Sequence, residues 1–278
     1  MSGSEVRRFQ IGAWNINAVV AGEGKPIVLL HGLGMSLKWW LPAVNEFSDE
    51  YLVCAIDLPG AGESTGSIVP TREACRDLVV GVIEALGAGP ALVVGHSLGG
   101  FVAANAAILD AAGLGGMLLV APGGFGQIKH PLLRMLSYPV LGNLMIYSGS
   151  LGARIFLRSA VFNAEALTPE VWKLADVPLH ERKAFLDQVR MGMHWGRTTA
   201  AYRVEAAAPP AVRAQLIWGR HDPVHPVADA YRAEQMLGTD PPVIFERSGH
   251  LPQIEEPDRF YATVRASAAR LWPESVQL

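Results

Sequence analysis

The sequence is poor in cysteine, with only Cys54 and Cys75 among its 278 residues. Two cysteines make no disulfide framework, and their spacing fits no zinc-binding motif. Each lies in an apolar pattern, so we expect both to be buried free thiols that pack as small hydrophobic side chains. A chain without disulfides suits a reducing compartment, and the sequence therefore predicts a cytoplasmic protein.

The chain also lacks a long apolar run and an excess of charge of either sign. Its most apolar stretch, Leu98–Leu109, is shorter than the roughly 20 residues that span a bilayer. The polar segment Met1–Gln10 has no apolar core of signal-peptide length. The net charge is −3, from 23 basic and 26 acidic residues, which offers no basic surface for nucleic acid and no polybasic membrane anchor. We therefore expect no nucleic-acid partner and no membrane span.

Half of the residues are hydrophobic and 18% are charged, which suits a globular protein with a sizeable core. Short apolar runs recur along the chain, most of them without alternation, as expected for strands buried on both faces of a parallel sheet. The first two alternate better and predict an antiparallel start of the sheet. The predicted strands are Arg8–Ile11, Asn15–Val20, Ile27–Leu30, Leu52–Ile56, Ala91–Val94, Met117–Val120, Gln215–Trp218 and Val243–Phe245.

Helical patterns separate several of these runs. In Thr71–Leu86 the apolar residues recur at three- and four-residue spacing, and Gly87 follows where a left-handed C-cap is expected. Pro257–Leu271 has a similar apolar face and begins with proline, which suits the first turn of a helix. This alternation of strands and helices predicts an α/β fold with a mostly parallel, doubly wound sheet.

Residues 125–208 interrupt the alternation and show no convincing strand. Within them Thr168-Pro169-Glu170 combines a capping hydroxyl with a proline at the first helical position. We therefore expect an α/β core formed by residues 1–124 and 209–278, and an all-helical cap, or lid, formed by residues 125–208. The helix-like pieces of the cap are Leu132–Leu136, Leu144–Phe156, Pro169–Leu174 and Glu181–Met193.

The strongest chemical signal is Gly95-His96-Ser97-Leu98-Gly99. A buried strand precedes it and an apolar helical pattern follows, which is the context that the Gly-x-Ser-x-Gly nucleophile elbow requires. The tight turn needs glycine for close backbone approach. It also lifts the serine to the amino end of a helix, whose dipole favours negative charge. We predict that Ser97 is a catalytic nucleophile, and the alternative is a structural turn serine.

With this and further motifs, the chain resembles an α/β-hydrolase with a helical cap over nearly its whole length. One such motif is His31-Gly32-Leu33-Gly34, a His-Gly-x-Gly loop that in similar proteins supplies a backbone N–H of the oxyanion hole. The resemblance implies that the N–H groups of Leu33 and Leu98 form this hole. Asp57–Ser64 resembles the family's Asp-x-Pro-Gly-x-Gly-x-Ser loop, which we interpret as a shape-setting turn.

A serine nucleophile needs a base that removes its proton and an acid that orients the base. His250 follows the last predicted strand, at a carboxyl end where such sheets place their sites, and its Gly-His-x-Pro context resembles the family's histidine motif. Asp222 follows the next-to-last strand. The order Ser97, Asp222, His250 is the one this fold requires, so we predict these three as the catalytic triad. The alternatives are a surface-loop histidine and an Asx-turn aspartate.

The sequence predicts neither a metal nor a cofactor. His221 and His225 flank Asp222, but no complete ligand set accompanies them at suitable spacing. The glycine-rich loops complete neither a dinucleotide-binding nor a P-loop fingerprint. We expect His31 and His96 to pack near the site without transferring protons.

We expect the cap to determine the substrate. It is rich in Leu, Met and aromatic residues, which favour an apolar acyl or aryl group over a charged or sugar-like one. At helical spacing the same residues also suit the cap's own core. The predicted partner is a small, apolar, ester-like molecule, and the oligomeric state stays open. The residues predicted to line the pocket are Gly34, His96, Met193, Trp195, Val224 and Leu251.

The first functional hypothesis is a carboxylesterase-like serine hydrolase that forms an acyl-enzyme intermediate. Dehalogenases and epoxide hydrolases of this fold carry aspartate at the elbow, so Ser97 excludes them. One alternative is a carbon–carbon bond hydrolase of ring-cleavage diketones, although His96 and Leu251 replace the asparagine and tryptophan common there. Further alternatives are a lactonase or perhydrolase, and a receptor-like binder that keeps the triad without turnover.

Overall fold

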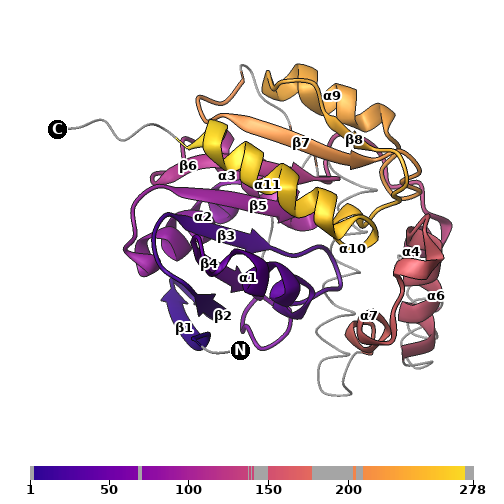
Figure 1. Cartoon of the computed structure of the whole chain (residues 1–278), viewed down its shortest axis with the longest axis horizontal. Helices are drawn as coiled ribbons and strands as arrows, with labels where there is room; N and C mark the ends of the chain where they lie inside the picture. Colours follow the sequence, from indigo (N-terminus) through magenta and orange to yellow (C-terminus); the bar gives the residue numbers. More distant parts are fainter. Residues whose placement is uncertain are drawn as a thin grey trace.

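The computed structural model describes residues 3–67, 71–136, 138, 140, 150–176, 203–204 and 209–272. They contain an eight-stranded sheet with the order β1-β2-β4-β3-β5-β6-β7-β8. Helices cover both of its faces (Figure 1), which confirms the predicted α/β fold. The strands are β1 (Glu5–Ile11), β2 (Trp14–Ala21), β3 (Pro26–Leu30), β4 (Leu52–Ile56), β5 (Ala91–His96), β6 (Leu114–Val120), β7 (Ala214–Gly219) and β8 (Val243–Phe245).

Every predicted strand is present, and the pairing follows the predicted pattern. β1 and β2 form an antiparallel pair, and β2 joins the edge of β4 in the antiparallel sense. From β4 through β3, β5, β6 and β7 to β8 all pairs are parallel. Because parallel strands point the same way, the loops that follow β3, β5, β7 and β8 meet at one edge of the sheet.

The two faces of the sheet bury separate apolar cores, because successive strand residues point to opposite sides. In β3, Val28 and Leu30 belong to the core under α2, α3 and α9, whereas Ile27 and Leu29 belong to the core under α1 and α11. In Figure 1, α1 and α11 cover the face nearer the viewer. The helices around the sheet are η1 (Leu37–Trp40), α1 (Leu41–Phe47), α2 (Arg72–Leu86), α3 (Leu98–Ile108), α9 (Ala228–Leu237), α10 (Pro252–Glu255) and α11 (Pro257–Leu271).

Helix α2 shows how local sequence signals set its ends. The Thr71 hydroxyl accepts a hydrogen bond from the Ala74 N–H at 3.1 Å, and Gly87 ends the helix in the left-handed region with φ 63°. The C-cap at Gly87 was predicted, whereas Thr71 lies just before the helix that it was expected to begin. Cys54 and Cys75 are buried free thiols, as expected, and burial raises the pKa of each to about 12.

Between β6 and β7 the described residues contain only helices. These are α4 (Pro131–Leu136), α6 (Ser150–Ala160), η2 (Ala164–Ala166) and α7 (Pro169–Leu174). In Figure 1, α4, α6 and α7 lie together beyond the end of the sheet to which the strand arrows point. None of the helices in the described part of the chain is long and apolar enough to cross a bilayer.

The predicted helices of this region agree with the structure to different extents. Pro169–Leu174 is confirmed, with the Thr168 hydroxyl accepting from the Val171 N–H, and Leu132–Leu136 corresponds to α4. Helix α6 begins at Ser150 and ends at Ala160, so it covers the second half of the predicted Leu144–Phe156 and continues beyond it. The first part of that segment and Glu181–Met193 lie outside the described residues. The division into core and cap stays a prediction.

Candidate active site

Ser97 lies at a strained turn between β5 and α3. Its φ of 51° and ψ of −109° are unusual for a residue other than glycine, and such strain persists only where the surroundings enforce it. Here the Ser97 N–H donates to the Val120 carbonyl at 2.9 Å. The Ser97 carbonyl accepts from the N–H groups of Phe101 and Gly123, each at 3.0 Å. The turn is therefore held from both sides.

The glycines around Ser97 are required by close backbone packing. A Cβ on Gly95 would lie 2.5 Å from the Gly99 carbonyl oxygen, and a Cβ on Gly99 would lie 2.3 Å from the Leu30 carbonyl oxygen. Both distances are far shorter than a carbon–oxygen contact allows. The first turn of α3 thus packs directly on β3 and β5, which explains physically why the elbow motif needs both glycines.

His250 and Asp222 meet through the loops that follow β8 and β7. His250 Nδ1 and Asp222 Oδ2 are 2.8 Å apart, and both residues are buried. The other carboxylate oxygen, Oδ1, accepts from the N–H groups of Val224 at 2.7 Å and His225 at 2.9 Å. With its proton on Nδ1, the His250 imidazole keeps Nε2 as a proton acceptor.

Burial controls the protonation of this pair. Burial lowers the pKa of His250, so its imidazole is neutral near pH 7 and can accept a proton. Burial also raises the pKa of the Asp222 carboxyl, while the adjacent N–H groups and His225 oppose that rise. The proton on Nδ1 of the neutral imidazole therefore lies in the buried hydrogen bond between His250 and Asp222.

Ser97 and His250 line one small cavity at the carboxyl edge of the sheet. Leu33, on the loop after β3, lines the same cavity. Leu98 is the first residue of α3, and the N–H groups in the first turn of a helix have no acceptor within the helix. The loop and the helix terminus that were predicted to supply oxyanion donors thus both adjoin Ser97.

The predicted pocket residues are distributed over three places. His96 and Val224 line the cavity with Ser97. Leu251 instead packs in an apolar cluster with residues of α6 and α7, and Gly34 lies in the turn after β3 with φ 71°. Met193 and Trp195 lie outside the described residues.

Several cavity residues were not named from the sequence. Leu133 of α4 and Phe156 of α6 bring apolar surface from the helical region, and Ile128 adds to it. His225 was weighed only as a metal ligand, although its place three residues after Asp222 puts it on the same loop. Met35 completes this set together with Gly32. Apolar periodicity in residues 125–208 was the available signal, but periodicity does not tell which side of a short helix faces a cavity.

Two further imidazole rings, those of His96 and His225, lie next to the ring of His250. The His96 ring lies 4.8 Å from that of His250, and His96 Nε2 donates to the His250 carbonyl at 2.9 Å. The His225 ring lies 5.4 Å from it. Burial lowers the pKa of His96 well below its usual value and that of His225 to about 3. Both rings are therefore neutral neighbours of His250 near pH 7.

His31 and Asp57 support the neighbouring loops. His31 Nδ1 donates to the Gly32 carbonyl at 2.8 Å, and Nε2 accepts from the Leu58 N–H at 3.0 Å. The buried Asp57 carboxylate accepts from the Leu37 N–H at 2.7 Å and from Asn17 Nδ2 at 2.8 Å. These contacts agree with a shape-setting role for the Asp57 loop. Within the described ranges no three His, Cys, Asp or Glu side chains gather in a way that could hold a metal ion.

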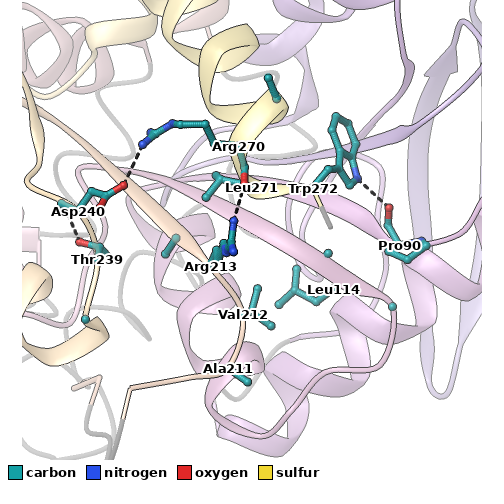
Figure 2. A pocket seen from close by; sticks show the side chains of 15 residues that line it. Pro90, Leu114, Ala211, Val212, Arg213, Thr239, Asp240, Arg270, Leu271 and Trp272 are labelled. Atoms are coloured by element: carbon teal, nitrogen blue, oxygen red, sulfur yellow. Dashed lines mark hydrogen bonds and ion pairs between the residues drawn. The ribbon is translucent and has the colours of Figure 1, made fainter. Parts of the chain in front are cut away.

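A second hollow lies at the opposite edge of the sheet, where β6 and β7 begin (Figure 2). Its charged groups are engaged with one another: Arg270 pairs with Asp240 at 2.8 Å, and Arg213 donates to the Arg270 carbonyl at 3.2 Å. The Trp272 indole donates to the Pro90 carbonyl at 2.9 Å. No strained residue and no buried acid–base pair accompanies these described residues, so we place the candidate site at the Ser97 edge.

The strand order and the elbow define an α/β-hydrolase fold. The sequence profile described as the alpha/beta hydrolase family matches residues 27–263, which is most of the chain. The protein belongs to this family.

Known relatives include different hydrolases. An uncharacterized protein of Mycobacterium tuberculosis is 28% identical over 261 residues, covering 87% of this chain and 74% of the relative. The 2-hydroxy-6-oxo-6-phenylhexa-2,4-dienoate hydrolase of Comamonas testosteroni is 26% identical over 252 residues, covering 86% of each chain. The solved structure of a carboxylesterase from Bacillus subtilis superposes with a TM-score of 0.74 at 19% identity, covering 95% of this chain and 90% of that one. The structural similarity concerns the fold alone.

Proposed function

We propose that this protein is a serine hydrolase that cleaves a carboxylic ester, with Ser97 as nucleophile, His250 as base and Asp222 as the orienting acid. The observation that carries the proposal is the buried hydrogen bond of 2.8 Å between Asp222 and His250, beside the strained turn of Ser97. Ser97 and His250 line the same cavity. A strained serine next to a buried acid–base pair is the arrangement that nucleophilic acyl transfer needs.

In the first half of the reaction, Ser97 Oγ attacks the ester carbonyl while His250 Nε2 accepts its proton. The carbonyl oxygen becomes an oxyanion, which accepts hydrogen bonds from the N–H groups of Leu33 and Leu98. The intermediate collapses when the bond to the leaving alcohol breaks and His250 returns the proton to that oxygen. The product of this half is an acyl group on Ser97 and a free alcohol.

In the second half, His250 takes a proton from water, and the hydroxide oxygen attacks the acyl carbonyl. The bond between the acyl carbon and Ser97 Oγ then breaks, and His250 returns the proton to Ser97 Oγ. This step releases a carboxylic acid and restores the enzyme. Asp222 holds the imidazole in one tautomer throughout and stabilises its charged form.

The cavity walls support a small, largely apolar acyl or aryl group as the substrate. Leu33, Ile128, Leu133, Phe156 and Val224 form one apolar cluster around it. Because Leu133 and Phe156 come from the helical region between β6 and β7, we propose that residues 125–208 act as a cap over the site. The buried free thiols fit the reducing cytoplasm that the sequence suggested.

A carbon–carbon bond hydrolase is the second candidate, since the Comamonas relative carries that kind of substrate in its name and matches 86% of this chain. Lactonase and perhydrolase chemistry would use the same three residues. A panel of aryl esters with acyl chains of increasing length, assayed beside one ring-cleavage diketone, separates these activities. We expect many cycles on an ester. Single-cycle cleavage would favour a binding protein, and faster turnover of the diketone would favour the second candidate.

Replacing the nucleophile tests the proposal directly. We expect Ser97→Ala to lower ester turnover by a factor on the order of 10⁴ to 10⁶, because the covalent route is lost. The melting temperature should change little. A serine-directed phosphonate should label Ser97 in the wild type, and a loss of less than about tenfold would rule out this assignment.

A further inference from the structure

A single buried carboxylate, that of Glu255, binds four backbone N–H groups from two separate segments. Its Oε1 accepts from Gly249 at 2.8 Å and from Leu251 at 3.3 Å. Its Oε2 accepts from Phe162 at 2.7 Å and from Asn163 at 2.9 Å. The first two donors flank His250, and the other two follow the end of α6. Glu255 thus links the loop of the proposed base to the helical region more than 85 residues upstream.

Other contacts bring the same two segments together. The His250 N–H donates to the carbonyl of Ala160, the last residue of α6, at 2.8 Å. A Cβ on Gly249 would lie 2.5 Å from that carbonyl oxygen and 2.8 Å from the Phe162 nitrogen, so only glycine fits here. The Phe162 ring stacks on His221 with centroids 3.9 Å apart. The end of α6 therefore lies against both loops that carry the acid and the base.

The charge of Glu255 makes this link strong. Burial raises the pKa of its carboxyl, and the four N–H groups oppose that rise by stabilising the charged form. Hydrogen bonds to an ionised acceptor are roughly twice as strong as neutral ones. A neutral side chain of the same size would leave buried donors without a good acceptor, which is costly.

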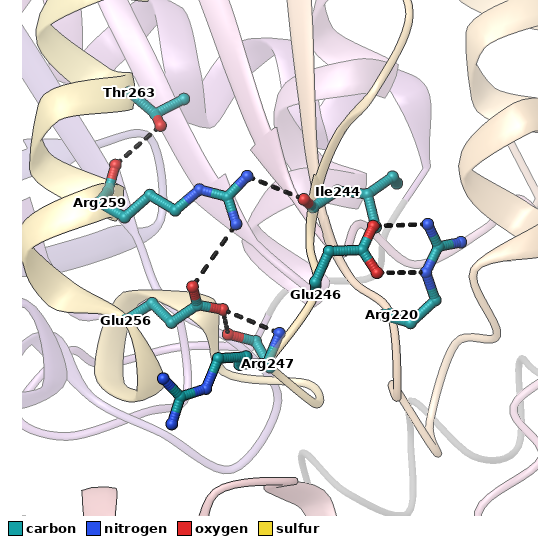
Figure 3. Close-up of polar contacts among 8 residues, drawn as sticks. Arg220, Ile244, Glu246, Arg247, Glu256, Arg259 and Thr263 are labelled. Atoms are coloured by element: carbon teal, nitrogen blue, oxygen red, sulfur yellow. Dashed lines mark hydrogen bonds and ion pairs between the residues drawn. The ribbon is translucent and has the colours of Figure 1, made fainter.

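The adjacent residue Glu256 provides a contrast. Its carboxylate accepts from the Arg247 N–H at 3.2 Å and from the Ser248 hydroxyl at 2.7 Å, and it pairs with Arg259. Figure 3 shows this group together with the exposed pair of Arg220 and Glu246. These contacts hold the start of the same loop, but they stay within residues 247–259. Of the two carboxylates, only that of Glu255 reaches the end of α6.

We propose that Glu255 is a positioning residue that fastens the end of α6 to the His250 loop, so that the placement of α6 sets the placement of the base. The proposal rests on the proposed role of His250. Phe156 lies one turn before Ala160 on the same helix and lines the cavity. A substrate that packs against Phe156 therefore contacts the element to which His250 is fastened, which couples substrate binding to the position of the proton acceptor.

The variant Glu255→Gln keeps the size of the side chain and removes its charge. We expect amide hydrogen exchange to become faster at both ends of the link together, at Gly249 and Leu251 and at Phe162 and Asn163. We also expect kcat for an aryl ester to fall about 10- to 100-fold with KM changed much less, because a displacement of about 1 Å in a catalytic group costs up to 10²-fold. A merely structural role would lower the melting temperature without this split between kcat and KM.

The matched control is Glu256→Gln, which makes the same chemical change one residue further on. Exchange should rise near Arg247 and stay unchanged at Phe162 and Asn163, and kcat should stay within about threefold of the wild type. A second variant, Gly249→Ala, leaves Glu255 intact and forces the segments apart with its Cβ. It should reproduce the Glu255→Gln result, and it carries the test if Glu255→Gln does not fold.

Two outcomes would overturn the proposal. In one, Phe162 and Asn163 keep their protection in Glu255→Gln, which would show that the carboxylate does not hold α6. In the other, protection is lost while kcat is unchanged, which would show that the link does not position the base. Failure of the proposed function is recognised separately, because Ser97→Ala would then keep its turnover while the exchange data still report on the link.

Discussion

The two edges of the parallel sheet use charged residues in opposite ways. At the amino edge, Arg270 and Asp240 are largely exposed and pair with each other. At the carboxyl edge, Asp222 and Glu255 are buried, and each carboxylate accepts hydrogen bonds from backbone N–H groups. Exposed ion pairs contribute little because water and salt screen them, whereas a buried carboxylate needs every hydrogen bond it has. Burial, rather than the number of charges, distinguishes the candidate site.

The largest effect in this comparison is expected at the buried acid. Asp222→Asn should lower ester turnover by a factor on the order of 10⁴, because an amide would favour the wrong tautomer of His250. Substrate binding should be retained, as measured by KM. Near-normal turnover would require an acid from elsewhere in the chain, and the segment Ala121–Gly124 after β6 offers none.

A smaller effect is expected at the cavity wall. Phe156→Ala should change the ratio of kcat/KM between short and long acyl esters by about 10- to 200-fold, as for a pocket contact worth roughly 1–3 kcal/mol. Met193 and Trp195 stay predicted wall residues and can be tested in the same way. The melting temperature is measured on the same variants. A lower melting temperature with an unchanged ratio would mean that Phe156 only holds the helices together.

Buried neutral imidazoles should make folding stability depend on pH. Burial lowers the pKa of His31, His96 and His225 in the folded chain. Below about pH 6.5, their ordinary pKa, these histidines bind protons in the unfolded chain but not in the folded chain, so their contribution to stability should fall as the pH drops. Each residue contributes up to about 1.4 kcal/mol per pH unit. Denaturant titrations between pH 7 and pH 5 measure the slope, and His225→Gln should reduce it; an unchanged slope would contradict the expectation for that residue.

The smallest effect is expected at the amino edge. Asp240→Asn removes the partner of Arg270 in an exposed pair, so it should lower stability by less than about 1 kcal/mol. Ester turnover should equal that of the wild type. The same chemical change as in Asp222→Asn would then have consequences that differ by orders of magnitude. A marked loss of turnover in Asp240→Asn would break the distinction between the two edges.

Much of the fold followed from local patterns. Strands such as Leu52–Ile56 were recognisable because apolar runs buried on both faces of a sheet lack alternation. The carboxyl end of α2 was recognisable because Gly87 acts through backbone groups only a few residues away. Ser97, Asp222 and His250 could be proposed together because each follows a strand, and parallel strands bring such loops to one edge.

The sequence by itself determined the sheet, the capped helices and the three candidate catalytic residues, since these depend on short-range geometry and on chain order. Only the tertiary structure decided which side chains share the cavity with Ser97. Phe156 and Leu133 line this cavity because the short helices α6 and α4, between β6 and β7, pack with these side chains toward it. It also decided the contacts of Glu255, whose donors at Phe162 and Asn163 lie more than 90 residues away. A hydrogen bond between distant segments leaves no periodic trace in a sequence, because it depends on where folding brings the two backbones.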